Sequence, residues 1–302
     1  EKLDDNLVRI KVFKNNDWVW QIIKLRNTDI NYIKNRFSND KVFSPILIKK
    51  GRKFYLQYAF EKKVVLPKLK YPNTKVCSVD LGLNHSAVCS IIDSKGTVID
   101  RLFINQPIEK DRLNRLLNRY KLKCKQGGRN NKPKIWGKIN GLNTQIVNNT
   151  VNKILNFAIS NNADVLVFEY LEFQGKKFGS KAIRLQLWAK RRIQEKCQHQ
   201  VHNYGLHFSR VSAKNTSKLA FDGSGIVVRN SKNASLCKFK NGKEYNCDLN
   251  ASYNIGARYF IREIEKTISE KEWLQYEAKV PCIARRTHCT LSTFKNLIVA
   301  MA

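Results

Sequence analysis

Short apolar runs separated by polar turns fill the first part of the chain, a pattern typical of β-strands. The pattern predicts three strands and one helix, at residues 7–13, 18–25, 42–48 and 28–38. The runs 46–48 and 54–60 flank Lys49-Lys50-Gly51-Arg52, which predicts a hairpin. This part of the chain is therefore expected to form a β-barrel or a sheet.

Two prolines separate this region from the rest of the chain. Pro67 and Pro72 each block the continuation of a helix or a central strand, so they mark a linker. We place a domain boundary near residue 72, which makes residues 1–72 a β-rich first domain.

The second part alternates strand and helix patterns. Three short strands with turn residues between them predict an antiparallel meander, at residues 76–82, 87–92 and 97–103. Helices and strands then alternate, at residues 109–125, 135–161, 164–169, 181–204 and 207–211, and a further helix begins at 248. This is the element order of an RNase H-like α/β fold with a mixed sheet, which we assign to residues 73–268.

Two acidic residues stand at the ends of apolar strands. Side chains alternate along a strand, so Val76, Ser78 and Asp80 share one face. Asp80 is the polar exception at the end of that strand, and Glu169 ends the almost wholly apolar run 164–169 in the same way. A third acid, Asp248, opens a segment with helical periodicity, where capping of the helix is the simplest role for a carboxylate.

Each of these acids alone is a weak functional signal, but together they indicate a metal site. In the expected fold Asp80, Glu169 and Asp248 converge, and three neighbouring carboxylates repel one another unless cations neutralise them. Their chemical use is to hold a pair of Mg²⁺ ions ~3.5–4 Å apart for phosphodiester hydrolysis. Hard oxygen ligands suit Mg²⁺ or Mn²⁺ better than zinc.

Composition adds the expected partner. Of 302 residues 42% are hydrophobic, enough to bury a core, and 56 Lys and Arg against 24 Asp and Glu leave a formal net charge of +32. Such an excess indicates a polyanion, and nucleic acid is the first candidate.

No stretch approaches the ~20 apolar residues of a membrane span, and the chain does not open with an apolar signal. We expect a soluble protein of the cytoplasm, associated with the nucleoid, with no membrane partner.

The motifs around the three acids resemble those of a known family. Val79-Asp80-Leu81-Gly82, Val167-Phe168-Glu169-Tyr170-Leu171 and the segment 242–255 around Asp248 resemble the three RuvC motifs of TnpB, the insertion-sequence "transposase" related to the type V CRISPR effector nucleases. Thr216-Ser217-Lys218 matches as well. The resemblance implies an RNA-guided DNA endonuclease with a RuvC site, partnered by a guide RNA and DNA. It makes Asp80, Glu169 and Asp248 the catalytic and Mg²⁺-binding triad, and the first domain part of a wedge domain.

The chain departs from that family in two respects. Relatives carry a zinc ribbon of two C-x-x-C pairs before the last aspartate, whereas no two of the eight cysteines here have that spacing. Cys237 and Cys247 are weak zinc candidates in this degenerate insert, about 214–247, and we expect buried free thiols and no zinc. The chain also begins with Glu1, partway into the wedge-like part, so we expect a fragment or a truncated form.

Two basic clusters are candidates for nucleic-acid contacts. The first, with Trp136 and a Gly-Gly loop, contains Arg112, Arg115, Arg119, Lys121, Lys123, Lys125, Arg129, Lys132 and Lys134. The second, which has Phe178 and Trp188 among its cations, contains Lys176, Lys177, Arg184, Arg191 and Arg192. The alternative is a solvated helix face for the charges and core packing for the aromatics.

Two other functions stay open from the sequence. One is a guide-independent, structure-specific nuclease, and the other is a catalytically weak nucleic-acid-binding accessory protein of a transposon. Residues 269–302 show little periodicity, and we interpret them as a C-terminal tail without an assigned role.

Overall fold

The computed structural model describes residues 2–4, 6–69, 71–82, 85–126, 133–170, 181–230, 233 and 235–302, with residues 2–4, 72 and 181–188 described by their backbone alone. The chain divides into two compact units, Glu1–Val65 and Leu66–Ala302. The division lies before the proline-rich stretch, whereas the sequence predicts it near residue 72. The reason is that this stretch contacts the second unit: a ring nitrogen of His207 hydrogen-bonds the Pro67 carbonyl, and Tyr71 packs edge-on against Phe260.

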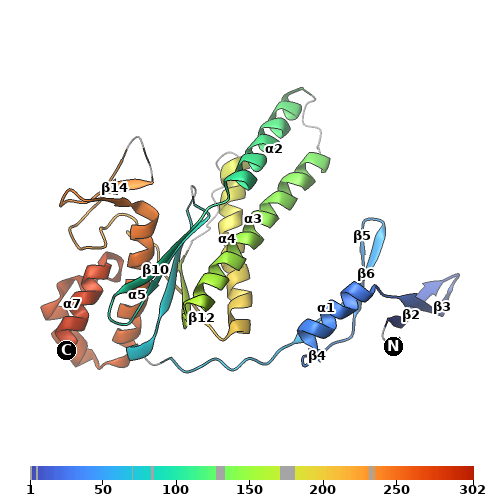
Figure 1. The fold of residues 1–302 in the computed structure, drawn as a ribbon, viewed down its shortest axis with the longest axis horizontal. Coiled ribbons are helices and arrows are strands. Elements are labelled where there is room, and N and C mark those ends of the chain that lie inside the picture. The colour runs from blue at the N-terminus through green and yellow to red at the C-terminus, as the bar shows by residue number, and fades with distance from the viewer. Residues whose placement is uncertain are drawn as a thin grey trace. The chain divides into compact units, whose positions relative to one another are not determined.

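The first unit contains small separate sheets and one helix (Figure 1). Its elements are β1 (Lys2–Asp4), β2 (Leu7–Lys14), β3 (Asp17–Lys24), α1 (Asn27–Phe37), β4 (Lys41–Val42), β5 (Ile46–Lys50), β6 (Lys53–Gln57) and β7 (Phe60–Glu61). The β5–β6 hairpin is confirmed, with Lys50 opposite Lys53. The single strand expected at 42–48 is wrong, because the ladder is interrupted at residues 43–45, where Pro45 lacks an N–H to donate.

This unit buries little apolar surface on its own. Among residues 6–65, Val8 is the one hydrophobic side chain that is buried. Phe13, Trp18 and Trp20 are all more than half exposed, on a face of the β2–β3 pair that also carries Arg9, whose guanidinium lies 4.4 Å from the Trp20 ring.

The second unit is built on a five-stranded mixed sheet, which confirms the mixed α/β architecture. Its strands are β8 (Val76–Asp80), β9 (Ala87–Ile92), β10 (Val98–Ile104), β11 (Val165–Tyr170) and β12 (His207–Ser212), in the order β10-β9-β8-β11-β12. Strands β8, β9 and β10 pair antiparallel, as the meander pattern predicts, while β11 runs parallel to both β8 and β12.

Helices cover both faces of this sheet (Figure 1). The helices of this unit, within the described residues, are α2 (Pro107–Gln126), α3 (Pro133–Ser160), α4 (Lys181–Val201), α5 (Cys247–Thr267), α6 (Glu270–Lys279) and α7 (Leu291–Met301). On one face, Cys77 and Val79 of β8 pack with α3 and α4. On the other face, Val76 of β8 and Val165 and Val167 of β11 pack against α5 and α7. The alternation of β8 side chains between two cores is confirmed.

A small three-stranded sheet precedes α5. It consists of β13 (Val228–Arg229), β14 (Leu236–Lys238) and β15 (Glu244–Asn246), ordered β13-β14-β15. Its core contains Cys237, Phe239 and Cys247, with Phe221 and Tyr245 packed against them. The region is therefore held by an aromatic cluster rather than left as an open loop.

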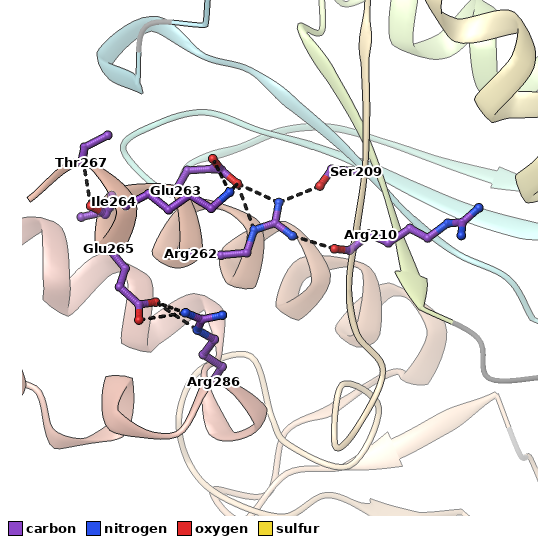
Figure 2. A network of polar contacts seen from close by, with 9 residues as sticks. Ser209, Arg210, Arg262, Glu263, Ile264, Glu265, Thr267 and Arg286 are labelled. Carbon is purple, nitrogen blue, oxygen red and sulfur yellow. Dashed lines mark hydrogen bonds and ion pairs between the residues drawn. The ribbon is translucent and has the colours of Figure 1, made fainter.

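The segment after residue 268 is not a tail, which corrects our interpretation of residues 269–302. Leu291, Phe294 and Leu297 of α7 are buried, and the Phe294 ring stacks on Phe260 of α5 with centroids 4.8 Å apart. A capping box begins each helix, Ser269 with Glu272 for α6 and Thr290 with Thr293 for α7. Figure 2 shows a further link, in which the Arg286 guanidinium pairs with Glu265 of α5 at 2.8 Å.

No helix in the described part of the chain is both long enough and apolar enough to cross a membrane.

Candidate active site

The three predicted acids belong to three elements that meet at one end of the sheet. Asp80 is the last residue of β8, and Glu169 is the next-to-last residue of β11. The two strands are parallel neighbours with Val79 opposite Phe168, so Asp80 and Glu169 come next in adjacent positions. Alternation turns both toward the face that α5 covers, and Asp248 lies in the first turn of α5. All three residues are partly buried.

Asp248 does not cap its helix, contrary to the simplest role considered for it. The cap is Asn246, whose side-chain oxygen accepts hydrogen bonds from the N–H groups of Asp248 and Leu249, both at 3.0 Å. The carboxylate of Asp248 is thereby left available for the site.

Gly82 allows Asp248 to approach the end of β8. A Cβ atom on Gly82 would lie 2.8 Å from Oδ2 of Asp248 and 2.9 Å from the His85 carbonyl. Any larger residue would force the Asp248 carboxylate or the backbone at His85 to shift. The glycine two positions after Asp80 is thus required by close packing within the site.

The electrostatics show that the acids interact. Burial raises the pKa of Asp80 well above its usual value, and the charges of Glu169 and Asp248 raise it further. Burial also raises the pKa of Glu169, to which Asp248 adds. Since each carboxylate disfavours the ionised form of its neighbours, the cluster carries repulsion that a bound cation would relieve.

Two lysines outside the predicted triad also act on the site. Against the effect of burial and of the other acids, the ammonium group of Lys190 on α4 lowers the pKa of Asp80 and of Glu169. Burial lowers the pKa of Lys110 in α2, while the charge of Asp248 acts in the opposite direction. No strand or helix periodicity marks such lysines, because they come from elements far away in the sequence.

Hydrogen bonds hold Glu169 at both its main chain and its side chain. The Gln194 amide on α4 donates to the Glu169 carbonyl at 2.8 Å, and the Thr216 hydroxyl donates to Oε1 of Glu169. Thr216 belongs to the Thr-Ser-Lys motif, for which the sequence alone indicates no role.

The donor set fits Mg²⁺ held by pairs of carboxylates. Within the described residues, no group of three His, Cys, Asp or Glu side chains is arranged to hold a single metal ion. Mg²⁺, however, usually takes one or two carboxylates and completes its shell with water and phosphate oxygens. The charges of Glu169 and Asp248 both act on Asp80, so these three acids are the candidates for such binding.

The first basic cluster lies on a helical hairpin. In Figure 1, α2 and α3 run side by side, and they are joined by a small core around Leu117, Tyr120 and Ile139. The basic side chains on the outer surface are exposed: Arg112, Arg115, Arg119, Lys121, Lys123, Lys125 and Lys134. Trp136 packs against Tyr120 inside the hairpin, with centroids 5.4 Å apart, so its ring is part of the packing. Arg129 and Lys132 lie outside the described residues.

The second basic cluster is described only in part. Lys176, Lys177 and Phe178 lie outside the described residues, and Arg184 and Trp188 are described by backbone alone. Arg191 is exposed but pairs with Glu195 at 2.8 Å, and Arg192 donates to Thr144 of α3 at 3.1 Å. Arg192 thus joins α4 to α3, whereas the Arg191 pair lies within α4 itself.

Cys237 and Cys247 lie together as buried free thiols. Burial raises the pKa of Cys237 to about 12 and also raises that of Cys247, and the two thiols interact with each other. The Cys237 thiol also donates to the Tyr245 carbonyl at 3.4 Å. Two thiols in such surroundings stay protonated at neutral pH.

The chain is similar to known proteins in sequence and in fold, although no family model matches it. A TnpB-like protein of Aquifex aeolicus (strain VF5) is 29% identical, over 69% of this chain and 74% of the relative. The fold is similar to that of a solved mini-RNA-guided endonuclease, CRISPR-Cas phi3, with a TM-score of 0.54, 12% identity, and coverage of 83% of this chain and 57% of that one.

A Cas12f1–sgRNA–target DNA complex gives a TM-score of 0.47 at 19% identity, over 68% of this chain and 54% of that one. The chain thus spans little more than half the length of these structural relatives. The match to the Aquifex protein covers most of both chains, and the resemblance of this chain to TnpB-like proteins is confirmed.

Proposed function

We propose that this chain forms the nuclease part of a TnpB-like, RNA-guided DNA endonuclease with an RNase H-like (RuvC) domain. The observation that carries the proposal is the meeting of Asp80, Glu169 and Asp248, from β8, β11 and α5, at one end of the sheet with their charges coupled. The resemblance to a TnpB-like protein supports the same reaction class.

Asp80, Glu169 and Asp248 would hold Mg²⁺ or Mn²⁺. Bound there, such ions would supply an activated water and stabilise the leaving oxygen of the phosphodiester. The protein's own part is to arrange the ligands: Gln194 holds the main chain of Glu169, and Gly82 gives Asp248 room beside β8. The positive charges of Lys190 and Lys110 act on the same acids, and they would favour the approach of a phosphate.

DNA and a guide RNA are the proposed partners. The solved relative CRISPR-Cas phi3 is named as an RNA-guided endonuclease, and its fold is similar to that of this chain. In this chain the exposed basic face of α2 is suited to phosphate contacts, because its apolar face is occupied by α3.

Amide substitutions test the proposal, since they keep the shape of each acid and remove its charge. In the full-length protein, Asp80→Asn, Glu169→Gln and Asp248→Asn should each abolish Mg²⁺-dependent DNA cleavage and leave nucleic-acid affinity nearly unchanged. Glu270→Gln, an exposed acid at the start of α6, is the matched control and should cut normally. Cleavage by Asp80→Asn at the wild-type rate would falsify the assignment.

Cleavage is measured with and without the guide RNA. A dependence on the guide is expected. Equal cleavage without it would favour a structure-specific nuclease, and DNA binding with no cleavage under either condition would favour an accessory protein.

A further inference from the structure

The Thr216 hydroxyl has more than one acceptor within reach. Thr216 is 2% exposed, and besides Oε1 of Glu169 its Oγ1 lies 3.0 Å from the Ala213 carbonyl. A hydroxyl carries a single proton, and an ionised carboxylate attracts it more strongly than a neutral carbonyl does. The proton of Thr216 is therefore directed to Glu169 whenever that acid is ionised.

We propose that Thr216 is a positioning residue for the Glu169 carboxylate and that α5 and the C-terminal segment hold it in place. The inference rests on the proposed function, in which Glu169 is a metal ligand. The second part of the inference gives residues 286–302, to which the sequence assigns no function, a role at the site.

The loop that carries Thr216 is held by two asparagines one turn apart on α5. The Asn254 amide donates to the carbonyls of Thr216 and Leu219, both at 2.9 Å. The Asn250 amide donates to the same Leu219 carbonyl at 2.8 Å, and its oxygen accepts from the N–H of Phe221 at 2.8 Å. Both asparagines are fully buried, so loss of either would leave buried backbone groups without partners.

Arg258, one further turn along α5, holds the start of the same loop. Its guanidinium, 4% exposed, donates to the carbonyls of Ser212 at 2.9 Å and Lys214 at 2.7 Å. On its other side it donates to the carbonyls of Thr287 at 2.8 Å and Cys289 at 3.1 Å. One buried side chain thus joins the loop before Thr216 to the segment before α7.

The helix α7 contacts this framework directly. The N–H of Leu291 donates to the Asn254 oxygen at 3.2 Å, and that of Ser292 donates to the Phe221 carbonyl at 2.8 Å. Figure 2 shows that the next turn of α5 continues the same pattern: Arg262 reaches the Arg210 carbonyl at 2.8 Å and Oγ of Ser209 at 2.7 Å, while Glu265 holds Arg286. The polar face of α5 therefore connects β12, the Thr216 loop and the C-terminal segment.

The test compares two substitutions of Thr216 with a matched control in the full-length protein. Thr216→Val keeps the shape and removes the hydroxyl, whereas Thr216→Ser keeps the hydroxyl. The control is Thr150→Val in α3, a fully buried threonine whose Oγ1 lies 2.8 Å from the Ile146 carbonyl and 2.7 Å from the Gln106 amide, in the opposite core. Mn²⁺ affinity without nucleic acid is measured by electron paramagnetic resonance, beside thermal stability and DNA cleavage.

Thr216→Val should weaken Mn²⁺ binding and cleavage by roughly 10–100-fold, the usual cost of losing a group that orients a metal ligand. Thr216→Ser should restore both, and Thr150→Val should lower stability without changing Mn²⁺ affinity. Wild-type Mn²⁺ affinity in Thr216→Val would overturn the inference, as would equal losses in Thr216→Ser or Thr150→Val. Asp80→Asn distinguishes a failure of this inference from a failure of the proposed function. If Asp80→Asn is inactive while Thr216→Val behaves as wild type, this inference fails and the proposed function stands. If Asp80→Asn still binds Mn²⁺ and cuts, the proposed function fails.

Discussion

The acid site and the basic hairpin of the second unit are built in opposite ways. The acids come from three elements far apart in the sequence, and each is set by neighbours such as Gly82, Asn246 and Thr216. The basic residues of α2 lie within one helix and are exposed to solvent, whereas its Leu117 and Tyr120 are buried.

Because of this difference, the acid site and the basic hairpin are expected to respond differently to substitutions. A metal site needs every ligand at its place, so a single substitution is expected to remove the chemistry. Binding of a polyanion sums over many separate contacts, so single substitutions there are expected to have graded effects. The acids also repel one another, so the acid site needs rigid surroundings to hold them together, whereas the basic hairpin does not.

The largest effect away from the acids is expected on α2. Changing Arg112, Arg115, Arg119 and Lys123 together to Gln should lower nucleic-acid affinity on the order of 10²-fold near 50 mM salt. The slope of log affinity against log salt should become shallower by up to about 3.6, since each lost phosphate contact removes ~0.9. Titrations at several salt concentrations measure both.

The control removes the same charge elsewhere. The exposed Lys271, Lys279, Arg285 and Lys295 of the C-terminal segment are changed to Gln, so that this variant has the same net charge as the α2 variant. If this variant loses as much affinity and slope as the α2 variant, binding depends on total charge and the hairpin has no special part.

A pair of glycine substitutions sharpens the comparison at the level of stability. A Cβ on Gly256 in α5 would lie 2.6 Å from Cδ1 of Ile92 and 3.1 Å from Oγ of Ser78, so Gly256→Ala should destabilise the protein by about 1–2 kcal/mol. A Cβ on Gly141, in the part of α3 that the hairpin uses, would meet nothing within 4 Å. There Gly141→Ala should stabilise by about 1 kcal/mol, because alanine favours the helix. Denaturant unfolding of both variants measures this, and equal signs would contradict the contrast.

The smallest effect is expected from zinc chelation. Between Thr216 and Asp248 the sequence holds two cysteines, and the aromatic packing of Phe221, Phe239 and Tyr245 stabilises the segment instead. Protein purified without added metal should contain less than about half an equivalent of zinc, and EDTA should shift Tm by less than about 1 °C. One zinc per chain, lost on Cys237→Ser, would show that other ligands complete a site.

Much of the sheet and the place of the acids could be predicted from local patterns. Alternation along β8 and β11 puts Asp80 and Glu169 on one face, and helical periodicity places Asp248 at the start of α5, as the structure has them. These predictions agree with the structure because strand alternation and helical periodicity depend on neighbours two to four residues away in the chain.

The surroundings of the site depend on contacts between distant segments, which no local pattern reports. Lys190, Gln194 and Thr216 reach the acids from α4 and from a loop. The prediction of a C-terminal tail is wrong because short 3-10 turns at residues 281–284 and 286–288 interrupt the periodicity of that segment. Its signals are nonetheless present: Ser269 and Glu272 have the spacing of a capping box, and Leu291, Phe294 and Leu297 recur every three residues.

The number of Mn²⁺ ions bound by the full-length protein tests the central claim most directly. In an electron paramagnetic resonance titration, wild type and the fourfold α2 variant should each bind about two ions per chain, as expected of a pair of ions shared by three carboxylates. Asp80→Asn, which removes the acid coupled to both others, should bind fewer than one. An Asp80→Asn variant that binds Mn²⁺ with the wild-type stoichiometry and affinity would contradict the account.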